Sequence, residues 1–423
     1  MNSSDDLFKE FLQADLAQIY VPVRPEFNLA ILYYLSTGMI WDRDGRYCPI
    51  DPNDMSVANE IKIIDSIKAG LKASNDEELG KEVLYHQLYK GHPYESYNYG
   101  DLSDLEALTL DDVKAFYANQ FTQSKLTVGL IGAIPSDVKS TMMKDLTQLP
   151  QGKESRLMIP DAPVLKGHHA TIVEKSAQST AVSFGFPIDT IRSSDDWTAL
   201  WLVRSYFGEH RSSNSFLYQR IRQTRGMNYG DYAYIEYFPR GMFQTKPDAN
   251  LGRSEQIFQV WLRPLRSNND AHFATRTALF ELDKLIKNGI SKEDFEATRN
   301  FLINFVPQMV ASQDRQLGYA LDSEFYNTES FVDYVRGKLE KLTLDDVNRV
   351  IRDNLQTENI HYVFITGDGK DMQKRLASEQ TSPMVYNAEK PAELVAEDKV
   401  IADYKLAIPA KNISVLDVEK VFQ

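Results

Sequence analysis

The chain has 423 residues, of which 43% are hydrophobic and 11% aromatic, and it carries a formal net charge of -13. This length allows two or three domains with cores, and the composition excludes a disordered or fibrous chain. The negative charge argues against a nucleic-acid partner, and no apolar run is long enough to predict a membrane span. Cys48 is the single cysteine, which excludes an internal disulfide framework.

The first part of the chain has mainly helical periodicity. Short elements are expected at 7–14 (helix), 17–23 (strand) and 27–35 (helix). Two longer helices follow, at 57–71 and 77–89, because apolar residues recur there at helical spacing. The segment LTVGLIG at 126–132 is dense in apolar residues and predicts a buried strand.

The hexapeptide LTLDDV occurs twice, beginning at Leu108 and at Leu342, and each copy is followed by a helical segment and an apolar strand. Thr109 or Thr343 can cap the helix, and an aspartate in the first turn suits the helix dipole. Two similar helix starts would give the same match. The order of the surrounding elements repeats as well, however, which favours an internal duplication.

The duplication predicts an α+β fold of two homologous α/β sandwich domains, each a mainly antiparallel sheet with helices packed on one face. We expect a first domain at 1–149, a linker at 150–167, a second domain at 168–377, and a tail at 378–423 that lies along the surface. The first copy is shorter before its LTLDDV, so its domain is expected to lack about 65 residues at the front. On that expectation the chain starts inside a domain.

The second copy carries the stretch SFLYQRIRQTRGMNYG, followed by the aromatic run DYAYIEYF. The apolar spacing fits a short amphipathic helix that Gly226 ends, with a strand after it. Tyr232 and Tyr234 would lie on one face of that strand. Arg222 and Tyr229 can then converge in front of the helix, where a guanidinium and a phenol can hold a carbonyl oxygen that gains charge. A surface arginine and a half-buried tyrosine would have the same spacing.

This stretch resembles the second-domain signature of the insulinase/pitrilysin zinc metallopeptidases, the inverted zincins, in which an arginine and a tyrosine have the spacing of Arg222 and Tyr229. The matching positions are Leu217, Tyr218, Gln219, Ile221, Arg222, Arg225, Gly226, Met227 and Tyr229. The resemblance implies that Arg222 and Tyr229 bind substrate and stabilise the reacting carbonyl opposite a zinc ion. The segment NDEELGKEVLYHQLYKGHPYESYNYG in the first copy also resembles the family, which implies the same two-domain fold.

A zinc site of that family needs H-x-x-E-H on one helix and a later glutamate. The seven histidines of this chain form no such motif, and at the expected place of the third ligand, Asp65 to Lys68, the only acid is the shorter Asp65. We therefore expect no metal in this chain, with zinc only in a partner or in a preceding segment. Glu78, Glu82 and His86 follow one helix face and could catch a metal, but a solvated helix edge explains the same spacing.

Two functions stay open. In the first, the chain is the non-zinc half of a peptidase, which binds peptide or unfolded protein at a sheet edge for a zinc-bearing homologous subunit or for a second copy. The back end of a longer peptidase would use Arg222 and Tyr229 in the same way. In the second, the chain is a catalytically inactive homologue that acts as a binding or scaffold protein. Retention of Arg222 together with Tyr229 favours the first, and the missing zinc ligands suit both.

The compartment also stays open. The opening MNSSDDLFKEF lacks the basic start and apolar middle of a signal peptide, which predicts the cytoplasm. If Met1 follows a removed export signal, the protein is periplasmic.

Overall fold

The computed structural model describes residues 39–41, 47–49, 57–98, 100–153, 159–238, 246 and 249–423. The helices are α3 (Val57–Ser74), α4 (Asp76–Leu88), α5 (Leu102–Ala107), α6 (Leu110–Gln120), η1 (Gln123–Lys125), α7 (Val138–Leu146), α8 (Trp197–Gly208), η2 (Tyr218–Gln223), α9 (Asn268–Asn288), α10 (Lys292–Met309), α11 (Gln313–Tyr326), α12 (Phe331–Lys341), α13 (Leu344–Asn354), α14 (Gly369–Ala377), α15 (Ala392–Ala402), η3 (Ala410–Asn412) and η4 (Val418–Lys420). The strands are β1 (Met39–Trp41), β2 (Tyr47–Pro49), β3 (His168–Glu174), β4 (Thr180–Ile188), β5 (Gly230–Tyr234), β6 (Gln256–Leu265), β7 (Ile360–Thr366) and β8 (Ile413–Asp417). Within the described ranges, none of the helices combines the length and apolar character that a membrane span requires. The elements predicted at 7–14, 17–23 and 27–35 lie outside the described residues.

A six-stranded mixed sheet organises the second half of the chain, with the strand order β5-β6-β4-β7-β3-β8. Neighbours from β5 to β7 are antiparallel, whereas β7, β3 and β8 are parallel to one another. In the centre of the sheet, Phe184 of β4 is paired with Val260 on one side and Tyr362 on the other. The predicted α+β class is confirmed.

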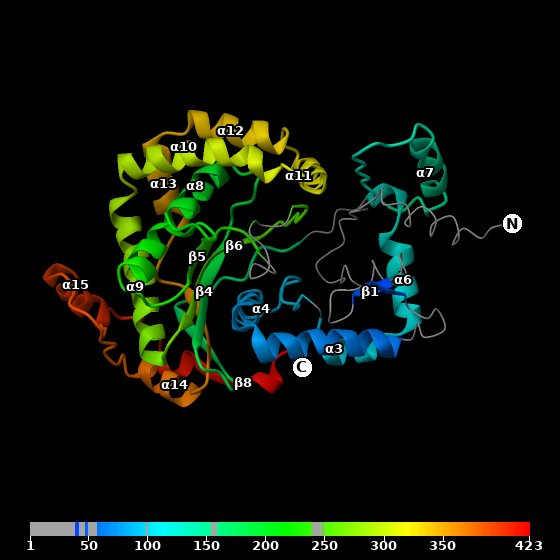
Figure 1. Ribbon diagram of the computed structural model, residues 1–423. Coiled ribbons are helices and arrows are strands. Elements are labelled where there is room, and N and C mark those ends of the chain that lie inside the picture. Colours follow the sequence, from blue (N-terminus) through cyan, green and yellow to red (C-terminus); the bar gives the residue numbers. More distant parts are fainter. Residues whose placement is uncertain are drawn as a thin grey trace.

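One face of the sheet carries the main core beneath α8, α9, α10, α12 and α13 (Figure 1). Alternate residues of β7, among them Tyr362 and Phe364, point into this core and are fully buried. Trp197 and Leu200 of α8 pack in the same cluster. The helices on this face form because their apolar stripes pack on the apolar side of the strands.

The opposite face of the sheet is covered as well, by α4 (Figure 1). Val363 and Ile365, the intervening residues of β7, pack there with Leu79. Gly80 permits the close approach, since a Cβ at this position would lie 3.0 Å from the Ser183 Oγ. This layer differs from the prediction of helices on one face only. The reason is that the central strands are apolar on both sides and must be covered twice.

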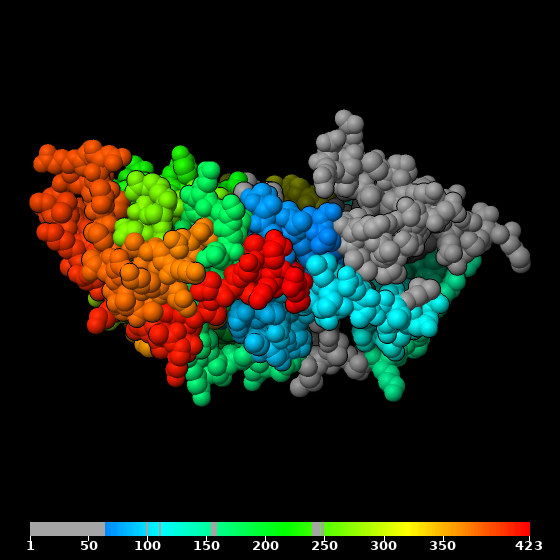
Figure 2. Space-filling model, turned by 90° about the horizontal axis from the view of Figure 1, so that it is seen from below, coloured from blue at the N-terminus to red at the C-terminus, as the bar shows by residue number. Residues whose placement is uncertain are grey.

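The C-terminal residues, predicted to lie along the surface, instead complete the sheet and the layer beside α4. Strand β8 pairs with β3 at the sheet edge. Phe422 meets the ring of Tyr97 with a centroid separation of 4.7 Å, and Lys72 of α3 pairs with Glu419 at 3.5 Å. Figure 2 shows these C-terminal atoms in red beside the blue atoms of α3. Segments from both ends of the described chain therefore cover the same sheet.

Both LTLDDV copies begin a helix with the same capping box, as predicted. Thr109 precedes α6 and Thr343 precedes α13, each with φ -105 and ψ 161. Each threonine hydroxyl accepts a hydrogen bond from the backbone of Asp112 or Asp346 at 3.2 Å. The two helices differ in packing, because Tyr117 of α6 is 51% exposed. In α13 the corresponding apolar face is fully buried, with Val347, Val350 and Ile351.

The strand predicted at 126–132 is not formed. These residues have no regular secondary structure and lie beside α11, where Gly129 faces Leu317 and Leu321. Before residue 168, the described residues hold only the two-stranded sheet of β1 and β2. Apolar density predicts burial, but a strand also needs a neighbour that pairs with its backbone. The sheet of the first predicted domain therefore does not occur in the described residues, and the domain boundaries stay predictions.

Candidate functional site

The stretch between α8 and β5 forms an irregular turn rather than a regular α-helix. Tyr218–Gln223 adopts a π-helical conformation, in which the backbone N–H of Thr224 donates to the carbonyl of Gln219 at 3.0 Å. Ile221 is fully buried and anchors the turn to the core. Gly226 ends the turn, as predicted, with φ +67, a conformation that favours glycine. Such π-helical turns are frequent at functional sites.

Arg222 and Tyr229 meet in front of this turn. The Arg222 guanidinium lies 4.7 Å from the centroid of the Tyr229 ring and 4.9 Å from that of Tyr218. One of its terminal nitrogens donates to the Tyr229 carbonyl over a long 3.4 Å. Tyr229 itself is 68% exposed. The predicted convergence of the two side chains is therefore present, and their role in catalysis stays a prediction.

Tyr218 contributes a second ring to the site, although the sequence analysis treated it only as a motif match. Its ring and that of Tyr229 both lie within cation–π range of the Arg222 guanidinium. Stacking of this kind restricts the guanidinium while leaving its in-plane N–H groups able to donate. A tyrosine four residues before an arginine is common on helices, so the spacing by itself carried no signal.

A buried carboxyl lies near the pair. Asp231 is fully buried and accepts a hydrogen bond from the Asn228 amide at 2.6 Å. Burial raises the pKa of Asp231 well above its ordinary value, against the opposing effects of Asn228 and Arg222. Among the described residues its second oxygen has no hydrogen-bond partner. Asp231 is therefore hydrogen-bonded to Asn228, and it forms no ion pair with Arg222.

Arg225, the second arginine of the motif, points away from this pair and holds the C-terminal tail. It is fully buried, and it donates to Asp398 at 2.9 Å, to Glu397 at 2.9 Å and to the carbonyl of Arg220 at 2.7 Å. The Tyr386 hydroxyl donates to the second oxygen of Asp398 at 2.5 Å. We call this group, Arg225 with Tyr386, Glu397 and Asp398, the tail clasp. The motif alone could not indicate it, because the partners lie far along the chain.

The tentative metal face at Glu78, Glu82 and His86 is engaged elsewhere. Glu78 pairs with Lys81 at 2.6 Å, and the His86 ring lies within hydrogen-bond distance of the Glu95 carbonyl. Glu78 and Glu82 are both buried, so the prediction of a solvated helix edge is wrong. The described residues contain no group of three or more histidine, cysteine or carboxylate side chains placed to hold a metal ion. The residues present do not fit the zinc site of an inverted zincin.

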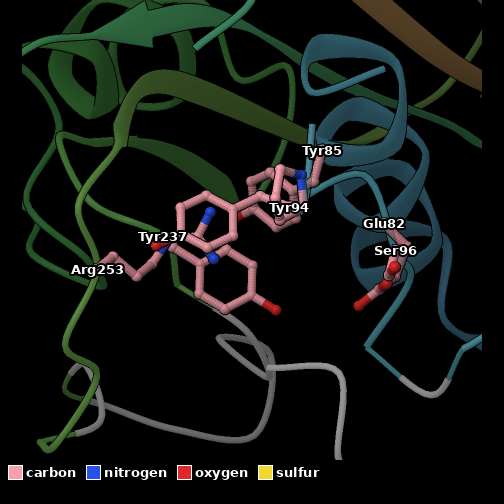
Figure 3. A pocket seen from close by; sticks show the side chains of 7 residues that line it. Glu82, Tyr85, Tyr94, Ser96, Tyr237 and Arg253 are labelled. Carbon is pink, nitrogen blue, oxygen red and sulfur yellow. The ribbon is translucent and has the colours of Figure 1, made fainter. Parts of the chain in front are cut away.

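A pocket lies between α4 and the sheet, and the sequence analysis did not identify it (Figure 3). Its lining comes from both parts of the chain and consists of Glu82, Tyr85, Pro93, Tyr94, Ser96, Tyr237 and Arg253. We call it the Arg253 pocket. Pro93, Tyr94 and Ser96 belong to the H-P-Y segment, residues 92–96 (HPYES) of the stretch that resembles the family, and Tyr237 belongs to the aromatic run DYAYIEYF. No local pattern connects these positions to Arg253.

Comparisons with known proteins agree with the architecture and the motif. Residues 107–302 match the model of the peptidase M16 inactive domain. The chain is 19% identical over 307 residues to the Non-peptidase homolog YmxG of Helicobacter pylori, covering 71% of this chain and 65% of that protein. It is 22% identical over 237 residues to an uncharacterized zinc protease of Mycobacterium leprae, covering 51% of this chain and 52% of that protein.

Among solved structures, the peptidase M16 inactive domain from Pseudomonas fluorescens has the same fold, with a TM-score of 0.61 at 18% identity. The match covers 73% of this chain and 70% of that structure. The chain spans less than two thirds of the length of the two curated relatives above. The predicted resemblance to the insulinase/pitrilysin peptidases is confirmed: residues 107–302 of this chain match the inactive domain of the peptidase M16 family.

Proposed function

We propose that this chain is the non-zinc half of a two-part peptidase, which binds peptide and stabilises the reacting carbonyl for a zinc-bearing homologous subunit. The observation that carries the proposal is the contact between Arg222 and the exposed Tyr229. A guanidinium and a phenol on one exposed turn form a donor pair suited to an oxygen that gains negative charge. The partner's zinc would supply the activated water.

Within this chain, Arg222 would donate from its in-plane N–H groups and Tyr229 from its hydroxyl. The long bond from Arg222 to the Tyr229 carbonyl, at 3.4 Å, is weak enough to exchange for a shorter one to substrate. Stacking on Tyr218 limits the rotamers of Arg222, which lowers the entropy lost on binding. Asp231 bonds to Asn228 instead of pairing with Arg222, which leaves the Arg222 guanidinium available to the substrate oxygen.

We do not expect the peptide to bind as an additional strand along β5. Gly208 at the end of α8 packs against the backbone of Ala233, and two residues later the His210 ring lies 4.8 Å from that of Tyr232 on the other face. The chain therefore crosses the outer edge of β5. A peptide would pass over Tyr229 at the start of the strand instead, where the phenol is exposed.

Two steps test the proposal. The native protein is purified from its own cells, and mass spectrometry identifies what accompanies it. A stoichiometric companion with H-x-x-E-H is expected. Peptide turnover by the mixture should then fall roughly 10- to 1,000-fold in Arg222→Ala and also fall in Tyr229→Phe. Arg336→Ala, at an exposed arginine outside the turn, should leave turnover unchanged. Equal turnover in Arg222→Ala would remove this residue from the mechanism.

A second candidate is a catalytically inactive binding or scaffold protein. It is favoured by the similarity to a protein named a non-peptidase homolog and by the match to the inactive domain. On this function the native protein would arrive without a zinc-bearing companion. Arg222→Ala would then leave all associations of the protein unchanged.

A further inference from the structure

Arg253 is a nearly buried cation whose contacts are all uncharged. Only 5% of the residue is exposed. Its guanidinium lies 3.7 Å from the centroid of the Tyr94 ring and 4.4 Å from that of Tyr237. Its hydrogen bonds go to the Glu255 carbonyl at 3.3 Å and to the Tyr89 hydroxyl. In the part of the chain that the structure describes, no carboxylate forms an ion pair with it.

Two nearby acids, Glu255 and Glu82, form no ion pair with Arg253, although Glu255 is close enough to attract it electrostatically. The Glu255 carboxyl accepts a hydrogen bond from the backbone of Ala162 instead. Glu82 lines the far side of the pocket, where both its oxygens accept from Asn98, and burial raises the pKa of Glu82 to about 7. In Figure 3, Arg253 enters the Arg253 pocket from the opposite side to Glu82, with tyrosine rings between them.

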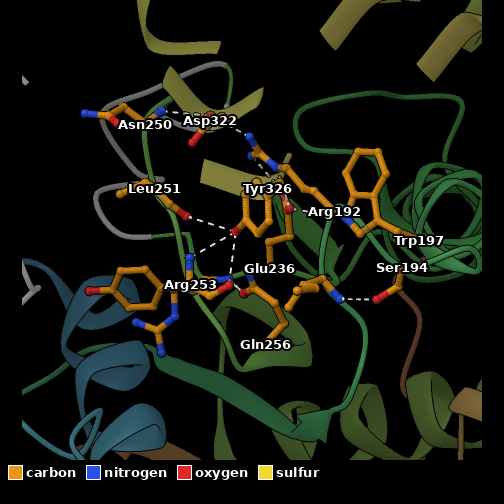
Figure 4. Close-up of polar contacts among 12 residues, drawn as sticks. Arg192, Ser194, Trp197, Glu236, Asn250, Leu251, Arg253, Gln256, Asp322 and Tyr326 are labelled. Atoms are coloured by element: carbon orange, nitrogen blue, oxygen red, sulfur yellow. Dashed lines mark hydrogen bonds and ion pairs between the residues drawn. The ribbon is translucent and has the colours of Figure 1, made fainter. Parts of the chain in front are cut away.

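The position of Arg253 is fixed by a buried polar network (Figure 4). Its backbone N–H donates to the Tyr326 hydroxyl at 2.9 Å. Three residues earlier, the backbone of Asn250 donates to Asp322 at 2.8 Å, and Asp322 also accepts from Arg192 at 2.6 Å. The backbone at Arg253 is therefore held in place before any ligand arrives, and the rings of Tyr94 and Tyr237 restrict the guanidinium.

A buried cation that has no ion-pair partner, only the through-space attraction of Glu255, is costly, and an anion that forms an ion pair with it recovers much of that cost. The rings of Tyr94 and Tyr237 occupy the faces of the guanidinium, so an anion must approach along its edge. That edge presents the N–H fork that matches the two oxygens of a carboxylate. The pocket in front of it is small, with room for about one water-sized group, and it is partly open to solvent.

We propose that the Arg253 pocket is a binding site for a carboxylate, supplied by the free C-terminus or by an acidic side chain of a peptide. The carboxylate forms a bidentate ion pair with Arg253, and Ser96 and the tyrosine rings enclose the adjoining group. Because Glu82 and Tyr94 come from the segment around α4 whereas Tyr237 and Arg253 flank the sheet, the ligand joins the two parts. This site does not rest on Arg222 or on the proposed peptidase role.

The test uses three small probes and ligand-observed NMR on the full chain. N-acetylalanine carries the carboxylate of a peptide terminus, the α-amide of N-acetylglutamate carries an acidic side chain, and N-acetylalaninamide carries neither. At least one acid should bind at least roughly 10-fold more tightly than the neutral amide, since a charge-assisted hydrogen bond is worth 1.5–3 kcal/mol. Binding of only one acid identifies the source of the carboxylate.

Variants locate the binding. Arg253→Gln should weaken it roughly 10-fold or more, and Arg253→Lys, which keeps the charge but loses the fork, several-fold. Arg299→Gln is the matched control, because Arg299 also stacks on a ring (Phe295, 4.9 Å) and donates to a carbonyl. Circular dichroism establishes that each variant is folded. If Arg253→Gln does not fold, the affinity of Arg253→Lys for the acids tests the proposal in its place. Arg222→Ala should bind like the wild type, which separates this site from the proposed peptidase site.

Three results would overturn the proposal: equal affinity for acid and amide, no binding of either acid, or unchanged affinity in a folded Arg253 variant. An equal loss of affinity in Arg299→Gln would also overturn the proposal, because removal of any arginine charge would then weaken binding.

Discussion

Removal of Arg225 should release the C-terminal helix α15. The substitution Arg225→Ala leaves the Asp398 carboxylate, only 5% exposed, without its cation. Loss of one partner of a buried ion pair costs about 3–5 kcal/mol. Asp398 keeps the hydrogen bond from Tyr386, and Glu397 keeps Arg220 at 2.6 Å, so the low end of that range applies. The expected destabilisation of the tail clasp is therefore about 3 kcal/mol.

Hydrogen exchange of the α15 amides measures this loss directly. A change of about 3 kcal/mol corresponds to roughly 100-fold faster exchange where local opening controls it. The matched control is Arg349→Ala, because Arg349 also pairs with two carboxylates, Asp196 at 2.7 Å and Asp353 at 3.2 Å, but its side chain is 48% exposed. Exposed pairs contribute at most about 1 kcal/mol, so exchange near Arg349 should change less than 10-fold.

A double variant distinguishes the effect of leaving a buried charge unpaired from the effect of losing the arginine side chain. Replacing Arg225 by methionine and Asp398 by leucine together should recover much of the protection lost in Arg225→Ala, because neither charge is then buried alone. Unchanged exchange of α15 in Arg225→Ala would refute the reasoning. The same would follow if the Arg349 control lost as much protection as the buried arginine.

Two further predictions concern pH and helix capping. Burial raises the pKa of Glu82 to about 7 from about 4.5, so the folded protein binds this proton more tightly than the unfolded chain. The contribution of Glu82 to stability is therefore greatest below about pH 4.5 and falls as pH rises to about 7, by about 3 kcal/mol. In urea unfolding across this range, Glu82→Gln should remove that decline, and a decline of the same size in the variant would exclude Glu82 as its source. Thr343→Ala should lower the free energy of unfolding by about 1 kcal/mol, because α13 is part of the main core. Thr109→Ala, at the same cap on the more exposed α6, should act mainly on local proteolysis near that helix, and equal global losses would contradict the difference in packing.

The Arg222–Tyr229 pair can be predicted from the sequence, whereas the Arg253 pocket cannot. Arg222 and Tyr229 lie within one short motif, and their contact requires only a turn and a glycine between them. The Arg253 pocket needs α4, the H-P-Y segment and the sheet to come together. A zinc site could be tested from the sequence as well, because H-x-x-E-H is a local pattern and none is present.

The features that the sequence by itself determined depend on interactions between residues that are close together in the chain. Both LTLDDV caps and the chain reversal at Gly226 follow from neighbours a few residues apart. Helix periodicity, capping and turn preferences act over that range, so they can be read before folding is known. The motif around Arg222 also sufficed to indicate the family.

Long-range pairing decided the rest. The apolar density at 126–132 could not reveal whether another strand would pair with it, and among the described residues none does. The burial of Glu82, the partners of Arg225 and the unpaired charge of Arg253 each depend on segments far apart in the chain. A sheet that is apolar on both faces must be covered on both by segments from elsewhere in the chain. Which segment covers which face is decided only in the tertiary structure.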